Sequence, residues 1–462
     1  MNEGSARAHS RVPATCADAG PVVTGPAPWD VSDVIRSALV FAFAAAVALT
    51  GVALPASAQA ESIQPPETAG LSLSADGRTR LHLALDAGLG FDTNPYTTPA
   101  ETDRFSGDLT ARIRPAVEVN MPGSLVAFTG KGRIDYGFLP GIVDASTRNF
   151  LLYQSAVSAD FEVNRGAMFN FAAGDAVSWH NDPGIAVVGT SLNRVDNLLR
   201  AGVGWTPGGG ALNLRLGYAF GFLKYLDLEQ KKGIISQGQL DTMNHTLHLR
   251  TDYRFFPKTG VFTVLHGGFQ NYPFTITQGY AFPVGLSIGV QGNVLPKLAG
   301  LASLGYSNPL VLDPRGALLT GSLFAAVGQL ELQYAPTATL SLSGGFQRKF
   351  DPIALYGFVG TNRFYGNFTQ TLLGRFALNM NIGYSVLQFG TEQSSIVLTD
   401  TPEGRMDSHL DGAVEIKYYV FDRLSFGVSN TTAWRTTNAN DVTGLNLGYL
   451  RNETLLLASL RY

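Results

Sequence analysis

The sequence predicts an all-β fold, and specifically a transmembrane, antiparallel, up-and-down β-barrel of about 18 strands. The pattern is clearest in the hairpin Phe105 to Phe138, where Leu109 and Ile113 alternate with Arg112 and Arg114. Alternation with period two belongs to a strand whose two faces differ. A soluble sandwich would show the same pattern. Repetition along the chain, small residues on the polar face and aromatic residues at strand ends favour a barrel in lipid.

Short and long connections alternate along the chain, as in outer-membrane barrels with short periplasmic turns. Eight short turns are predicted at Asn120–Ser124, Asn164–Gly166, Thr206–Gly210, Pro257–Gly260, Leu295–Lys297, Ala335–Thr337, Leu373–Arg375 and Phe421–Arg423. Nine long polar loops are predicted at Asp92–Arg104, Leu139–Asn149, Ala176–Arg194, Gly221–Leu240, Asn271–Pro283, Ser307–Ser322, Asp351–Asn362, Gly390–Gly404 and Thr436–Tyr449. This count needs an even number of strands with both termini on the short-turn side.

Composition narrows the class of protein. Only 15% of the 462 residues are charged and the net charge is −3, which is ordinary for an outer-membrane barrel and unusual for a cytosolic protein. Neither a basic nor an acidic excess points to nucleic acid. The single cysteine, Cys16, excludes an intramolecular disulfide framework and a multi-cysteine metal site.

The N-terminal region predicts export. The apolar stretch Ser37 to Leu54 follows Arg36 and ends in small residues, which is typical of a secretory signal cleaved after Ala58 or Ala60. A membrane anchor is the alternative, disfavoured by the short run. We therefore expect an N-terminal extension and cleaved signal peptide over 1–60, a periplasmic lead-in over 61–78 and the barrel over 79–462. The unpatterned residues 1–33 also suggest that translation starts later than Met1.

Aromatic residues next to the short turns predict an interfacial girdle on the lipid face. They are Phe128, Phe161, Phe169, Trp205, Phe255, Phe262, Tyr334, Phe376, Tyr418, Phe426 and Tyr462. The last strand ends in Leu456, Ala458, Leu460 and Tyr462, which resembles the signal read by the outer-membrane assembly machinery. Outer-membrane lipid and that machinery are therefore the predicted partners.

One stretch also resembles a known family. Leu85 to Tyr96, LDAGLGFDTNPY, is similar to the opening of the putative outer-membrane β-barrel porin family, and the segments Asn181–Pro183 and Asn193–Asn197 are similar in type. The resemblance implies a pore. Some relatives resemble exporters of extracellular polysaccharide, which would add polysaccharide-secretion components to the partners.

Catalytic and metal-binding motifs are lacking in the sequence. His245 and His248 have a spacing that places them on opposite faces of a strand, so they do not form a metal pair. No G-x-S-x-G, P-loop or H-E-x-x-H pattern occurs. We expect neither a cofactor nor an enzyme.

The informative polar residues are those that alternation assigns to the lumen. The candidate pore-lining residues are Arg112, Arg114, Lys131, Arg133, Arg200, Arg215, Arg250 and Arg254. Fewer acids accompany them on these early strands, namely Asp108, Glu118, Asp135, Asp160, Glu162 and Asp252, whereas acids are commoner on the later strands, with Glu331, Asp411, Glu415 and Glu453. Two interpretations stay open: mutually paired charges in a wet lumen, or a basic wall that attracts anions.

The predicted function is therefore passive. A barrel of about 18 strands is wide enough for an aqueous channel, so we expect a porin-like passage for small hydrophilic or anionic solutes, with export of an extracellular polysaccharide as a finer option. The loops Ala176–Arg194 and Gly221–Leu240 could constrict it. The alternative is a structural or adhesive barrel with a plugged lumen.

Overall fold

The structure is a computed structural model that describes residues 70–74, 78–95, 107–123, 125–139, 150–152, 154–182, 192–226, 240–273, 279–312, 316–318, 325–353, 357–390, 404–438 and 448–462. The predicted extension and signal peptide, residues 1–60, lie outside the described residues. Within the described ranges, no helix has the length and apolar character needed to cross a membrane.

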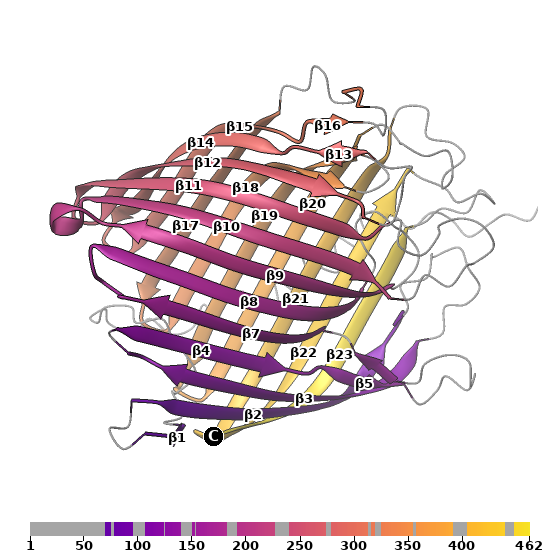
Figure 1. Cartoon of the computed structure of the whole chain (residues 1–462). Helices are drawn as coiled ribbons and strands as arrows, with labels where there is room; N and C mark the ends of the chain where they lie inside the picture. Colours follow the sequence, from indigo (N-terminus) through magenta and orange to yellow (C-terminus); the bar gives the residue numbers. More distant parts are fainter. Residues whose placement is uncertain are drawn as a thin grey trace, which may run out of the picture. The chain divides into compact units, whose positions relative to one another are not determined.

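All the described strands join one antiparallel sheet that closes into a barrel, with 18 strands in its wall (Figure 1). The wall strands are β2 (Arg80–Asp92), β3 (Asp108–Met121), β4 (Val126–Arg133), β7 (Gln154–Val163), β8 (Phe169–Asp182), β9 (Leu192–Trp205), β10 (Leu212–Tyr225), β11 (Thr242–Phe256), β12 (Thr259–Asn271), β14 (Val284–Leu295), β15 (Leu298–Asn308), β17 (Ala326–Thr337), β18 (Leu340–Ile353), β19 (Gly357–Leu372), β20 (Phe376–Phe389), β21 (Met406–Phe421), β22 (Leu424–Thr437) and β23 (Tyr449–Arg461). Closure comes from pairing of β2 with β23, in register from Ala84 opposite Arg461 to Asp92 opposite Glu453. A closed sheet leaves no edge, so every strand can satisfy its backbone groups inside a membrane.

Short strands supplement this wall. β5 (Tyr136–Phe138), β6 (Phe150–Leu152), β13 (Tyr280–Ala281) and β16 (Val311–Leu312) extend neighbouring wall strands on the long-loop side. β1 (Leu71–Ser72) pairs with the start of β2, so part of the predicted lead-in forms a small hairpin. The one described helix is the 3-10 turn η1 (Gly208–Gly210).

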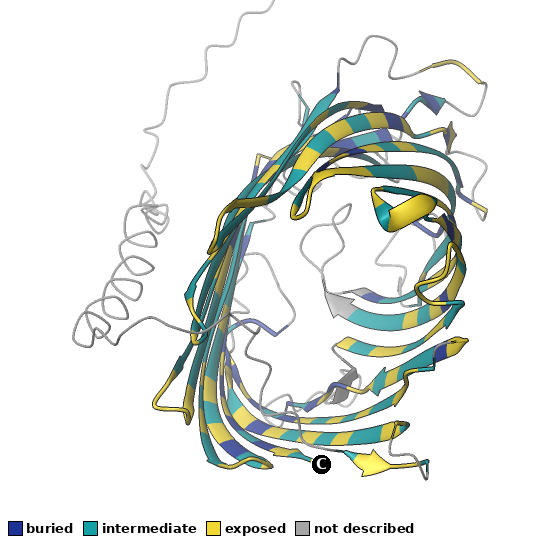
Figure 2. Cartoon of the chain, turned by 90° about the vertical axis from the view of Figure 1, so that its left-hand side faces the viewer, coloured by how far each residue is buried: buried dark blue, intermediate teal, exposed yellow. Residues whose placement is uncertain are grey.

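The predicted alternation of faces is confirmed. On β3, Leu109 is 62% exposed and Ile113 53%, whereas Thr110 and Arg112 are only 2% and 7% exposed. Figure 2 shows the same change between exposed and less exposed residues along the wall strands. The exposed apolar side chains belong to the outer face, where lipid replaces water as the solvent, and the polar side chains point inward.

The predicted short turns are confirmed with one displacement, but two of the predicted long loops begin and end well inside strands. The β17–β18 turn lies at Ala338–Thr339, after the predicted site, because Thr337 still pairs with Leu340. In the first of these long loops, Ala176–Arg194, β8 and β9 pair as far as Asp182 opposite Leu192, which leaves only residues 183–191 between them. The predicted long loop Asp351–Asn362 is also wrong. β18 and β19 continue to pair up to Ile353 opposite Gly357, which leaves only residues 354–356 between them. Of the two loops expected to constrict the lumen, residues 183–191 and 227–239 lie outside the described residues.

The aromatic girdle is present on the outer face beside the short turns. Phe128 and Phe161 have ring centroids 4.8 Å apart, as do Phe376 and Tyr418. Arg423 stacks over the Tyr462 ring, 4.3 Å from its centroid. Aromatic rings of this kind anchor a barrel at the membrane surface.

The prediction that Phe262 belongs to that girdle is wrong. It is 5% exposed and lies in register with Asp252 and Gly289 on the inner face, beneath the guanidinium of Arg250 at 4.5 Å. The β11–β12 pairing contains a bulge between Arg254 and Phe256. This bulge lies on β11 and does not set the face of Phe262. On β12, Val261 is 39% and Leu265 53% exposed, so the two-residue period itself places Phe262 inside, and nearness to a turn is not a reliable sign of the outer face.

Candidate functional site

The inner wall carries all eight basic residues that the sequence singles out: Arg112, Arg114, Lys131, Arg133, Arg200, Arg215, Arg250 and Arg254. Their faces follow from the register, in which Lys131 lies opposite Glu118 and Arg215 opposite Arg250. Arg112, Arg114 and Arg133 also share a hollow of about 530 Å³ with residues of β20 to β23. Side chains from such distant positions around the barrel can meet only on its concave side.

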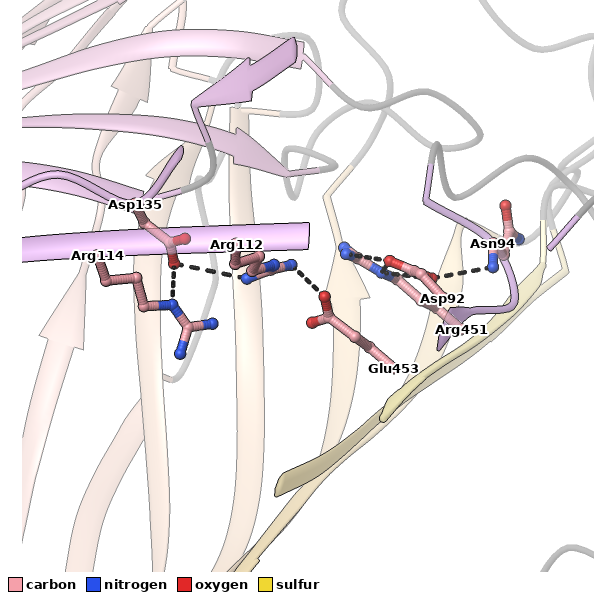
Figure 3. A network of polar contacts seen from close by, with 7 residues as sticks. All are labelled: Asp92, Asn94, Arg112, Arg114, Asp135, Arg451 and Glu453. Atoms are coloured by element: carbon pink, nitrogen blue, oxygen red, sulfur yellow. Dashed lines mark hydrogen bonds and ion pairs between the residues drawn. The ribbon is translucent and has the colours of Figure 1, made fainter. Parts of the chain in front are cut away.

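A chain of buried ion pairs crosses the seam between the first and last strands (Figure 3). Arg112 Nη2 lies 2.6 Å from Glu453 Oε1, and Arg112 Nη1 lies 3.5 Å from Asp135 Oδ2. Arg114 donates through Nε to the same Asp135 oxygen at 3.1 Å. Arg112, Glu453 and Asp135 are each at most 7% exposed. These two guanidiniums are therefore compensated by carboxylates.

The same seam holds a second pair, formed by Asp92 of β2 and Arg451 of β23. Arg451 Nη2 donates to Asp92 Oδ2 at 2.6 Å, and the backbone N–H of Asn94 donates to Asp92 Oδ1 at 3.0 Å. Asp92 is completely buried. Ionised groups so deeply removed from water persist only when they are paired and hydrogen-bonded, so this pair fixes how β2 meets β23.

Sequence reasoning missed a further buried cluster at the loop-side end of β21 and β22. Asp407 Oδ2 lies 2.7 Å from Arg405 Nη2 and 2.5 Å from Arg435 Nη2, with all three side chains at most 4% exposed. Arg405 and Asp407 stand two residues apart, and side chains at that spacing share one face of a strand. That spacing could have indicated an ion pair on the inner face. It was missed because the two residues directly follow a predicted long loop.

Four more of the predicted residues have partners nearer the solvent. Lys131 Nζ lies 3.3 Å from Glu118, Arg200 Nη2 3.0 Å from Asp160, and Arg250 Nη2 2.8 Å from Asp252. The Arg200 pair reaches across Gly174, where a Cβ would stand 2.2 Å from Asp160 Oδ1. Arg254 donates through Nε to the carbonyl of Gly210 at 3.0 Å and so closes the short turn between β9 and β10.

Arg133 and Arg215 differ from the other six. Neither has an ion pair or hydrogen bond to any other residue that the structure describes, and both side chains are exposed. Arg133 lines the 530 Å³ hollow. Arg215 stands opposite Arg250, whose guanidinium is already engaged by Asp252 and Gln291. Arg133 and Arg215 are therefore uncompensated cations on the inner wall, whereas Arg254 keeps a hydrogen bond to an uncharged carbonyl.

The two histidines at close spacing point to opposite faces. His245 lies on the outer face, where Nδ1 is 2.8 Å from the Tyr218 hydroxyl, and His248 lies in register with His266 on the inner face. No group of three or more potential metal ligands occurs among the residues that the structure describes.

Comparison with known proteins gives one family. The family model described as putative beta-barrel porin 2 matches residues 80–447. No curated protein sequence matches the chain.

Solved structures with a similar fold are outer-membrane proteins at low identity. OpdQ of Pseudomonas aeruginosa is 10% identical, with 83% of this chain and 98% of that chain covered and a TM-score of 0.42. OccK8 (OprE) of the same organism is 13% identical, with 83% and 98% covered and a TM-score of 0.42. The outer-membrane channel DcaP of Acinetobacter baumannii is 10% identical, with 85% and 99% covered and a TM-score of 0.39.

Proposed function

The chain belongs to the putative beta-barrel porin 2 family and lies in the bacterial outer membrane, and from this premise we propose that it is a passive channel for small hydrophilic solutes that prefers anions. Porins are channels and, as a class, not enzymes. The observation that carries the preference is the pair of uncompensated guanidiniums, Arg133 and Arg215, on the inner wall. Five of the other six predicted cations lie beside carboxylates, and the sixth, Arg254, is held by a backbone carbonyl.

The electrostatic argument is local. A paired charge presents a dipole to a passing ion, and its field falls off quickly. An unpaired guanidinium in a confined wet space raises the concentration of anions around it. Screening shortens the reach of this field from ~10 Å at 0.1 M salt to ~3 Å at 1 M, so anion preference should be mild and should weaken as salt rises.

Planar bilayers test the proposal. The purified protein should give discrete conductance steps, and its reversal potential in a KCl gradient should indicate chloride preference. Replacing Arg133 and Arg215 together by Gln should abolish that preference. The matched control is the double variant Lys131→Gln with Glu118→Gln, which removes a compensated pair and should leave the reversal potential unchanged. Cation preference in the unaltered protein, or an unchanged double arginine variant, would refute the assignment.

The cargo is a finer part of the proposal. Anionic saccharides and an exported extracellular polysaccharide are the first solutes to test, and the second would require polysaccharide-secretion components as partners. Folding would depend on the outer-membrane assembly machinery, acting on the strand that ends at Tyr462. A structural or adhesive barrel with a plugged lumen is the competing proposal, and it requires bilayers without conductance steps.

A further inference from the structure

An aromatic ring lies against the inner wall on β19, away from the eight basic residues predicted from the sequence. Tyr365 of β19 stands in register with Gly345 of β18. A Cβ at Gly345 would come within 2.7 Å of the Tyr365 hydroxyl oxygen and 2.8 Å of Cζ, so the phenol ring occupies the space that a side chain at 345 would fill. The Tyr365 hydroxyl donates to Glu331 Oε2 at 2.7 Å and fixes the ring there. The ring therefore lies over Gly345 on the inner side of the wall and remains partly exposed.

Polar side chains surround this ring in a hollow of about 390 Å³. Arg363 Nη2 donates to Asp411 Oδ2 at 2.9 Å, and the pair lies over Gly383, where a Cβ would be 2.5 Å from the guanidinium and 2.7 Å from the carboxylate. Gln347, Asn367, Asn381 and the apolar Ile382 complete the lining. The volume falls within the range of about 300–1,000 Å³ that holds small molecules in proteins.

This combination has a particular chemistry. The axial C–H groups of a pyranose ring form an apolar face that packs against an aromatic ring, and its hydroxyls both donate and accept hydrogen bonds. Amides, a carboxylate and a guanidinium around the ring supply acceptors and donors in fixed planes. The Arg363–Asp411 pair is neutral as a unit, while the Glu331 carboxylate behind Tyr365 disfavours an anionic ligand.

We propose that this hollow, lined by Tyr365, Arg363, Asp411, Gln347, Asn367 and Asn381, is a binding subsite for one uncharged hexose unit of a saccharide. The inference rests on the proposed channel function, since the sugar reaches the site through the lumen. The hollow shares Asn381 and Asp411 with the larger hollow that contains Arg133. A saccharide of several units can therefore extend from the ring toward the basic wall.

Sugar block of single channels tests the subsite, with a maltooligosaccharide as the probe. The sugar should cause brief closures whose half-blocking concentration, measured relative to each variant's own open current, rises about tenfold in Tyr365→Ala through loss of the stacking surface. Tyr365→Phe keeps the ring and should stay close to the unaltered protein. The control Tyr384→Ala removes an aromatic ring from the outer face of the adjacent strand, where Tyr384 is 38% exposed, and should change neither current nor block.

The outcomes separate the two proposals. Conductance steps without sugar block, or equal block in Tyr365→Ala, would overturn the subsite and leave the channel in place. The absence of steps would refute the channel, and calorimetric titration of the detergent-solubilised barrel with the same sugar then decides the subsite by itself. Weaker binding in Tyr365→Ala supports the subsite, while no binding, or equal binding in Tyr365→Ala, refutes it. Binding confined to a carboxylated saccharide also contradicts it.

Discussion

Two parts of the inner wall treat a passing solute differently. The wall from β3 to β11 carries the predicted arginines and lysine, most of them paired with carboxylates. The wall from β17 to β20 carries mainly amides and hydroxyls, which surround Tyr365. Among them are Gln347, Asn367 and Asn381. The first wall can act on charge through the few cations left unpaired, and the second can act through hydrogen bonds. The number of charged residues therefore says less about a lumen than the number without partners.

The largest effect is expected where the charged wall is buried. Arg112→Gln leaves the Glu453 carboxylate, 6% exposed, without its closest cation, and should destabilise the barrel by about 3–5 kcal/mol. Lys131→Gln breaks a pair that is 58% and 39% exposed and should cost about 0–1 kcal/mol. Urea unfolding from lipid vesicles measures both. Equal costs would mean that burial does not separate structural pairs from solvent-facing ones.

The second prediction compares the free-energy cost of an added arginine on the outer face with its cost on the inner wall. Leu109→Arg places a charge among lipid tails and should cost roughly 2–4 kcal/mol, whereas Ala116→Arg, on the inner face of the same strand, avoids that membrane penalty. Folding into vesicles, followed by the gel-mobility shift of unheated samples, reports the difference. Equal tolerance at both positions would contradict the assignment of faces.

The smallest effect tests whether an ion pair with a carboxylate is what stops a cation on the inner wall from contributing to anion preference. Gly174→Ala introduces a methyl group 2.2 Å from the present position of Asp160 Oδ1, so the carboxylate must move away from Arg200. Both partners are about half exposed, so stability should change by less than about 1 kcal/mol. Anion preference should rise, because Arg200 then loses its carboxylate partner and joins Arg133 and Arg215 as an uncompensated cation. The control Gly202→Ala meets only a backbone oxygen at 3.3 Å, and a shift of equal size there would count against the argument.

Much of the fold follows from the sequence because alternation and turn residues are local signals. They give the strand rhythm, the outer face and the positions of the short turns. They do not give the register between strands, which decides that Arg112 meets Glu453 across the seam. They also fail where two strands continue past an expected loop, at Ala176 and at Asp351. Nearness to a turn does not fix the face of an aromatic residue, since Phe262 lies inside.

The same holds for the candidate sites: local sequence patterns predict which face a side chain occupies, but they do not predict its partners on other strands. Alternation identifies side chains for the inner face, but pairing across strands separates Arg133 from Arg112. The tyrosine subsite depends on two glycines, Gly345 on β18 and Gly383 on β20, which flank β19 and leave room for the larger side chains of that strand. No pattern within a single strand contains that information.

The seam has a consequence for how the chain folds. Every other pair of neighbouring wall strands is consecutive along the sequence, whereas Asp92 and Arg451 are 359 positions apart. Contacts so distant carry the full entropic cost of closing a long loop and form slowly. We expect β2 and β23 to pair last. Their buried ion pairs would then form only after the rest of the sheet has assembled, and they would stabilise the closed barrel. In a variant carrying Ala87→Cys and Ala458→Cys, which face each other across the seam, oxidative cross-linking should lag behind the protease resistance of the remaining hairpins. Cross-linking that precedes this protection would show that the ends of the chain meet first.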